Sequence, residues 1–332
     1  MGYDSTVLRR AAARLEQSRK DREEALQRRR KEIFTQLPEA ADIDRQIRGT
    51  CMDIIRSSFL TRRDPAPALA AIRDKNMDLQ VRLAQLLEGA GYPPDALDDV
   101  PSCKKCGDSG WVQGQMCDCL KVLCAQEQVK ELSKLLDLGE QSFDSFSLDW
   151  YSPLPWPGES LSPRENMEFL CELCMNYAQK FGKFYFQNLF LTGNPGLGKT
   201  FLSACIARTA AENGFSVVYD TAVNLFAQFE EQKFGRDSEG TAQTETRRYL
   251  SCDLLILDDL GSELTTPFVQ SALYNLINTR LVQNKATIIS SNLSMDGVRE
   301  RYNGQTASRL EGEYRVLRFY GDDIRLLRKA RL

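Results

Sequence analysis

The sequence has 332 residues, of which 42% are hydrophobic and 27% charged, and its formal net charge is −3 at pH 7. These values are ordinary for a globular protein with two or three folding units. Histidine is absent, which excludes Ser-His and Cys-His nucleophile pairs, imidazole bases and histidine-containing metal sites. There is no apolar run of about eighteen residues and no signal-peptide core, so we expect a cytoplasmic protein without membrane contact.

Residues 1–99 are predicted to form a helical arm or bundle. Residues 4–35 are rich in Ala, Leu, Glu and Arg and lack Gly and Pro, which indicates a long polar helix. Further helices are expected at about 42–59 and 67–87. Residues 1–63 carry 15 Lys/Arg against 10 Asp/Glu, so this region has either a nucleic-acid contact or simply solvated helix faces.

Four cysteines follow the helices with the spacing C-x2-C-x10-C-x-C, in a segment with little apolar content. Thiolates are strong Zn²⁺ ligands, and glycine turns bring such cysteines together. We therefore predict a zinc module at residues 100–125, ligated by Cys103, Cys106, Cys117 and Cys119. Cys124 is an alternative ligand, but a helix beginning near Leu120 would turn it away.

A helix from about Leu120 to Leu136 and a loop rich in Pro and Gly suggest that residues 126–161 form a helix and a linker. Cys171 and Cys174 have a similar local spacing to zinc ligands. They lie in an amphipathic helical pattern, however, and packed core thiols are the better interpretation.

From residue 162 onward, short β-branched or apolar runs alternate with helical stretches. The runs are 189–192, 216–219, 254–258, 287–291 and 315–320. This alternation predicts an α/β fold over residues 162–332, in which a parallel sheet is wound with helices.

The segment GNPGLGKT joins the first of these runs to a helix and has the pattern of a phosphate-binding loop (P-loop). Its glycines allow backbone N–H groups to face phosphate oxygens at a helix N-terminus. Lys199 is expected beside the β- and γ-phosphates, and the Thr200 hydroxyl on Mg²⁺. The predicted nucleotide-binding residues are Gly193, Asn194, Pro195, Gly196, Leu197, Gly198, Lys199 and Thr200.

Two acidic residues end the run LLILDD. We expect Asp258 to hold Mg²⁺ through water and Asp259 to polarise the attacking water. Asn292, after the run ATIISS, is placed to orient that water if its strand lies between the P-loop strand and the Asp258 strand. The structural alternative for Asp258 and Asp259 is an acidic turn after a core strand, and the alternative for Asn292 is an ordinary turn residue.

Arg309 and Arg325 are the candidate cations near the C-terminus. Arg309 lies too far along the chain to be expected at its own subunit's phosphate, so it is predicted to reach a neighbouring subunit's nucleotide. Arg325 is predicted to contact the γ-phosphate of its own subunit. Surface ion pairing is the alternative for both. Residues 299–332 carry 9 Lys/Arg against 5 Asp/Glu, so this end of the sequence is also a possible nucleic-acid contact.

The motifs GNPGLGKT, LLILDDLGSE, IISSNLS and TASRLEG, followed by GDDIRLLRKARL, resemble the AAA+ ATPases of the DnaC/DnaI helicase-loader and IstB transposition-helper group. The similarity extends over about residues 140–332. It implies Asp258 and Asp259 as the metal-side acids, Asn292 as first sensor, Arg309 as arginine finger and Arg325 as second sensor. Asp259 stands where most AAA+ proteins have Glu, which implies slow ATP hydrolysis. The chain also stops without room for the usual helical lid.

The segment CKKCGDSGWV…CDC is similar to the cysteine module of DnaI-like loaders, which implies a docking domain in front of the ATPase. A contact of Lys104, Lys105 and Trp111 with DNA is the alternative. The resemblance implies an ATP-dependent loader of a hexameric replicative DNA helicase onto single-stranded DNA, which self-associates through Arg309. Two other functions stay open: a transposition helper on duplex DNA, and an ATP-binding adaptor without significant hydrolysis.

Overall fold

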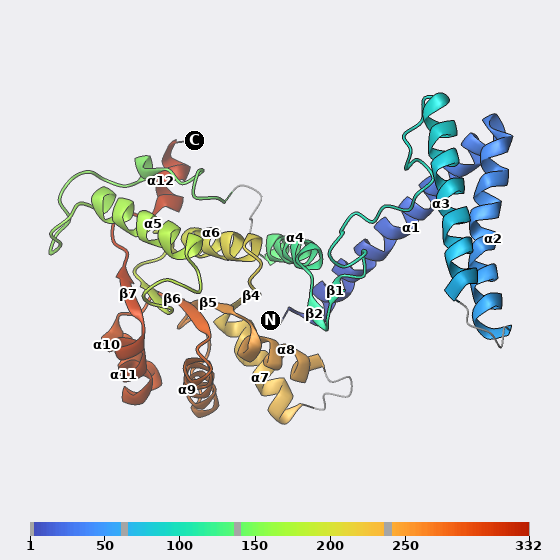
Figure 1. Cartoon of the computed structure of the whole chain (residues 1–332). Helices are drawn as coiled ribbons and strands as arrows, with labels where there is room; N and C mark the ends of the chain where they lie inside the picture. The colour runs from blue at the N-terminus through green and yellow to red at the C-terminus, as the bar shows by residue number, and fades with distance from the viewer. Residues whose placement is uncertain (1–2, 61–65, 136–140, 236–240, 332) are drawn as a thin grey trace. The chain divides into compact units, whose positions relative to one another are not determined.

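The computed structural model describes residues 3–60, 66–135, 141–235 and 241–331, coloured along the chain in Figure 1. The chain divides into two compact units. The smaller unit comprises residues 13–117, and the larger comprises residues 1–12 and 118–332. Within the described ranges, no helix has both the length and the apolar character needed to cross a membrane. The domain limits expected from the sequence remain predictions.

Three long helices account for most of the smaller unit, which confirms the predicted helical N-terminal region. They are α1 (Ser5–Gln36), which begins in the larger unit, α2 (Pro38–Leu60) and α3 (Ala66–Gly89). Ile33 of α1 is buried against Leu87 of α3, together with Ala96 and Leu97 of the following segment. Arg30 donates from Nη2 to the Leu97 backbone oxygen at 2.6 Å, which ties this segment to α1.

A short hairpin follows in the smaller unit. β1 (Trp111–Val112) pairs antiparallel with β2 (Gln115–Met116). The two turn residues between them, Gln113 and Gly114, both have positive φ, as a tight two-residue hairpin turn requires. The hairpin returns the chain so that the Cys117 N–H donates to the Gly110 oxygen at 2.8 Å.

The larger unit contains a five-stranded parallel sheet, which confirms the predicted α/β class. Its strands, in the spatial order β4-β5-β6-β3-β7, are β4 (Val217–Thr221), β5 (Leu254–Leu260), β6 (Ala286–Ser291), β3 (Leu189–Thr192) and β7 (Arg315–Arg318). The helices are α4 (Asp118–Leu135), the short helix η1 (Leu148–Trp150), α5 (Pro163–Gln179), α6 (Lys199–Glu212), α7 (Ala222–Phe234), α8 (Thr241–Ser251), α9 (Pro267–Val282), α10 (Met295–Tyr302), α11 (Gly304–Glu313) and α12 (Ile324–Arg331).

Both faces of the sheet are covered, and successive side chains of one strand enter different cores. Leu189 and Leu191 of β3 join the core made with α5 and α6, whereas Phe190 joins the core made with α7, α9 and α11. A strand buried on both faces has an almost continuous apolar sequence, which is why these runs are visible in the sequence. Cys174 of α5 is fully buried in the first core, and Cys171 packs against that core.

Two N-terminal elements pack on the β4 side of the sheet. The Gln128 side chain on α4 donates to the Phe215 oxygen at 2.8 Å and accepts from the Val217 N–H at 3.2 Å, and so it pairs two backbone groups where the edge strand β4 begins. The first residues of the chain also lie here: Tyr3 donates to the Gly214 oxygen at 2.5 Å, and Asp4 pairs with Arg248 of α8 at 3.5 Å.

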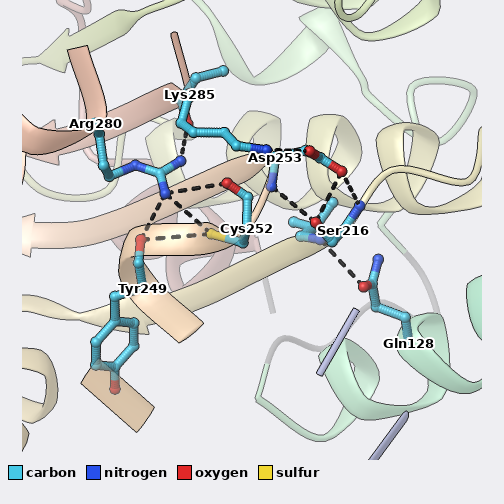
Figure 2. Close-up of polar contacts among 9 residues, drawn as sticks. Gln128, Ser216, Tyr249, Cys252, Asp253, Arg280 and Lys285 are labelled. Carbon is cyan, nitrogen blue, oxygen red and sulfur yellow. Dashed lines mark hydrogen bonds and ion pairs between the residues drawn. The ribbon is translucent and has the colours of Figure 1, made fainter. Parts of the chain in front are cut away.

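A fully buried arginine, Arg280 of α9, contacts Tyr249 and Cys252 at the end of α8 (Figure 2) and also contacts β6. Arg280 donates from Nη1 to the backbone oxygens of Tyr249 at 2.6 Å and Cys252 at 3.2 Å, and from Nη2 to that of Ala286 at 2.5 Å. Tyr249 and Cys252 lie at the C-terminal end of α8, where helix carbonyls lack intrahelical partners and attract cations. The guanidinium therefore caps α8 and holds it beside the sheet.

Candidate nucleotide site and cysteine cluster

The P-loop connects the end of β3 to the start of α6, as the sequence predicts. At Gly193, φ is +151°, and an added Cβ would lie 2.2 Å from the Phe319 oxygen. Gly198 has φ +93° and precedes the first residue of α6. Glycine at these two positions permits the turn and its close approach to the segment after β7.

Lys199 is almost buried, and its ammonium group lies inside the loop. Nζ donates to the backbone oxygens of Gly193 at 2.6 Å and Asn194 at 2.8 Å, and to Oδ1 of Asn292 at 2.9 Å. Burial lowers the pKa of Lys199 to about 8, although Asp258 and Asp259 oppose this shift. The buried cation is thus held at the centre of the loop, where phosphate oxygens are strong competitors for its hydrogen bonds.

Asp258 is nearly buried and accepts hydrogen bonds from three hydroxyl groups. Its Oδ2 accepts from Tyr219 at 2.6 Å and from Thr200 at 3.1 Å, and its Oδ1 accepts from Ser290. Sequence reasoning missed Tyr219 and Ser290 as neighbours of this carboxylate. Burial and the nearby Asp258 raise the pKa of Tyr219, so its phenol stays protonated and remains a donor.

Asp259 points away from its neighbour because the strand is irregular there. The pairing of β5 with β6 shifts between Leu257 and Leu260, and Asp259 has φ +57°. A bulge of this kind redirects a side chain at the end of a strand. The exposed Asp259 carboxylate accepts from Nδ2 of Asn292 at 3.1 Å, so Asn292 connects Asp259 to Lys199.

Most of these residues line one cavity of about 740 Å³, whereas Gly193, Asn194 and Tyr219 do not. Its polar wall contains the P-loop from Pro195 to Thr200, with Asp258, Asp259, Ser290 and Asn292. A second wall comes from the segment expected to be only a linker and from the chain end: Phe146, Trp150, Tyr151, Ile324, Arg325 and Arg328. This combination offers an apolar, aromatic surface for a base and a polar surface for phosphates.

The second wall contains a cation over an aromatic ring that the sequence did not reveal. The Arg328 guanidinium carbon lies 5.6 Å from the centre of the Trp150 ring, a cation–π distance. The N–H of Ile324, the first residue of α12, donates to the Gly196 oxygen at 3.0 Å. The short helix α12 therefore contacts the P-loop and contributes to the cavity.

The two arginines predicted near the nucleotide have different positions. Arg325 lines the cavity. Arg309 is exposed on α11 and does not line the cavity of its own chain. This placement is compatible with the predicted contact to a neighbouring subunit, which stays a prediction, as do the roles of the other predicted site residues.

The four cysteines of the predicted zinc module form a cluster. The Sγ atoms of Cys103, Cys106, Cys117 and Cys119 all lie within 4.8 Å of one another. Those of Cys103 and Cys117 are 3.7 Å apart, close to the roughly 3.8 Å that Zn–S bonds of about 2.3 Å give in a tetrahedron. Cys124 is outside this group and buried. The donor set and the spacing fit Zn²⁺.

Neighbouring groups hold the cysteine loop in place. The Asp108 carboxylate accepts from the N–H groups of Ser102 at 3.0 Å and Cys103 at 2.7 Å, and it is paired with Arg22. The Gly110 N–H points at the Cys106 sulfur at 3.4 Å. Such outer contacts orient metal ligands and stabilise thiolates.

Comparison with known proteins agrees with the nucleotide site. Residues 184–309 match the family model "IstB-like ATP binding protein". The chain is 27% identical over 194 residues to the chromosomal replication initiator protein DnaA of Aquifex aeolicus, covering 56% of this chain and 45% of that protein. It is 29% identical over 117 residues to the replicative helicase loader DnaI of Bacillus subtilis, covering 35% of this chain and 36% of that protein. The chain thus spans less than half the length of these relatives.

Two solved structures align with about half of this chain. The crystal structure of the DnaC helicase loader aligns with 54% of this chain and 98% of that chain, at 20% identity and a TM-score of 0.42. The crystal structure of DnaI aligns with 57% of this chain and 92% of that chain, at 18% identity and a TM-score of 0.44.

Proposed function

We propose that this chain, which is an IstB-like AAA+ ATPase, hydrolyses ATP to load a hexameric replicative DNA helicase onto single-stranded DNA during replication initiation. ATP binding follows from the family match over residues 184–309. The relation to a helicase loader and to replication initiators supports a client in DNA replication. The observation that carries the ATPase assignment is that Lys199, Asp258 and Asn292 line the same cavity.

The arrangement supports a role in hydrolysis for five of the predicted residues. Lys199 would bind the β- and γ-phosphates. Thr200 and Asp258, 3.1 Å apart, would hold Mg²⁺, which neutralises charge on the phosphates when it is bound. Asp259 would accept a proton from the attacking water, which Asn292 would orient from its position beside Asp259. Because the Asp259 side chain is shorter than glutamate, we expect slow turnover.

We place the helicase contact on residues 1–125, with Zn²⁺ on the four cysteines. The test is a pull-down with the replicative helicase, using the full chain, a chain without residues 1–125, and a Cys103→Ser/Cys106→Ser variant. We expect both altered proteins to lose the helicase but to keep ATP binding. Retention of the helicase by the deleted chain would show that the ATPase region alone makes the contact, contrary to the proposal.

Self-association is the proposed source of the arginine finger. Arg309 is exposed and away from its own cavity, so a second copy of the chain would present it to the neighbouring nucleotide. Guanidinium suits this task because it stays charged and donates two parallel hydrogen bonds. We expect ATP to promote assembly and Arg309→Ala to weaken it, as measured by light scattering.

The IstB-like family match also favours a second candidate, a transposition helper that acts on duplex DNA. ATP-dependent filaments on duplex DNA in electron micrographs would support this candidate. Helicase loading onto single-stranded DNA that requires Lys199 would support the first, and loading unchanged in Lys199→Ala would indicate an adaptor without turnover.

A further inference from the structure

Tyr219 lies outside every recognised motif of the ATP site but contacts its buried acidic residue directly. Its hydroxyl donates to Asp258 Oδ2 at 2.6 Å. We infer that Tyr219 is a positioning residue, which holds the Asp258 carboxylate in the orientation that nucleotide-bound Mg²⁺ requires. The inference rests on the proposed magnesium–ATP site.

The sheet allows Asp258 to be held from both sides. β5, which carries Asp258, lies between β4 and β6 in the sheet. Tyr219 reaches from β4, where it is paired with Ile256, two residues before the carboxylate. Ser290 reaches from β6 and donates to the other oxygen. Donors on opposite neighbouring strands oppose rotation of the carboxylate in either direction.

The third donor differs in kind from these two. Thr200 is itself expected to turn a lone pair of its hydroxyl oxygen toward Mg²⁺, while its proton can still donate to Asp258 over 3.1 Å. Tyr219 and Ser290 are the two donors that have no expected contact of their own with the metal. A carboxylate has about four acceptor positions, so three donors leave room for metal-bound water. Groups that orient metal ligands typically change metal affinity by about 10–100-fold when removed.

The adjacent residue of β4 provides a matched control. Asp220 accepts from the Tyr249 hydroxyl of α8, also at 2.6 Å. Tyr249 is buried, like Tyr219, and neither Tyr249 nor Asp220 lines the nucleotide cavity. Tyr249→Phe therefore removes the same phenol–carboxylate hydrogen bond from the same strand end without affecting the Asp258 carboxylate.

The experiment measures nucleotide affinity of the full chain rather than turnover. A fluorescent ATP analogue is titrated with excess Mg²⁺ and again with a chelator, for wild type, Tyr219→Phe and Tyr249→Phe. For Tyr219→Phe we expect an approximately tenfold loss of affinity with Mg²⁺ and unchanged affinity without it. For Tyr249→Phe we expect both affinities to equal those of wild type, while its melting temperature falls.

Two results would overturn the inference. The first is a nucleotide affinity of Tyr219→Phe in Mg²⁺ that equals that of wild type. The second is an equal loss of affinity with and without the metal, which would indicate a general structural role. If Tyr219→Phe fails to fold, Ser290→Ala removes the opposite donor, and the same loss restricted to the magnesium form is expected. Wild type that binds no nucleotide would refute the ATP site itself. Wild type that binds normally but loads no helicase would contradict only the loader proposal.

Discussion

Replacing Arg280 with methionine should strongly destabilise the larger unit. The arginine is fully buried, and it donates to the backbone oxygens of Tyr249 and Cys252 (Figure 2). It also donates to the Ala286 backbone oxygen and to the Thr287 hydroxyl. Methionine fills a similar volume but leaves three carbonyl groups without this donor. A buried acceptor left unsatisfied costs about 1–3 kcal/mol, so we expect the free energy of unfolding to fall by at least about 3 kcal/mol.

Urea denaturation followed by circular dichroism measures this change. With a slope of about 2–3 kcal/mol per molar urea, the midpoint should fall by about 1–1.5 M. Arg208→Met is the control, because Arg208 pairs with Glu212 on the surface of α6 at 3.0 Å and such pairs contribute about 0.3–0.5 kcal/mol. A midpoint for Arg280→Met that equals the control's would refute the capping role of the buried guanidinium.

Three further predictions concern the zinc, the lysine and the arginine finger. Purified wild type should contain about one zinc ion per chain and Cys103→Ser much less, as measured by metal analysis after dialysis, and a metal-free wild type would contradict the four-cysteine site. Burial lowers the pKa of Lys199 to about 8, and contact with phosphate would raise this pKa again. Above about pH 8, ATP binding is therefore coupled to uptake of a proton by Lys199. ATP affinity should therefore fall as pH rises above about 8 in wild type but hardly in Lys199→Arg, whose guanidinium stays charged; parallel pH profiles in titrations of the two proteins would disprove this. Arg309→Ala should bind ATP normally but turn it over slowly, and mixing it with Lys199→Ala should restore part of the phosphate release, whereas full activity of Arg309→Ala alone would exclude the finger.

The sequence was sufficient to predict the fold class. The three N-terminal helices and the parallel sheet follow from local patterns: helix-forming composition without Gly or Pro in α1, and apolar runs in strands that are buried on both faces. The P-loop and the four-cysteine segment were equally visible, because each is a short run in which the spacing of a few residues carries the chemistry. Their expected positions needed no knowledge of which strands are neighbours.

Tertiary structure alone decided which distant residues complete the site. β6 lies between β5 and β3, and this order places Asn292 between Lys199 and Asp259. Tyr219 reaches Asp258 from a neighbouring strand, and Trp150 reaches the cavity from an apparent linker. No local pattern marks either side chain as part of the site.

The physical reason is the range of the interactions. Periodicity and turn chemistry act over a few residues and are written in the sequence, whereas strand order and the bulge that turns Asp259 outward depend on contacts between segments far apart in the chain. The ATP-binding loop was therefore determined locally, and the hydroxyl groups around Asp258 were determined only when the strands packed together.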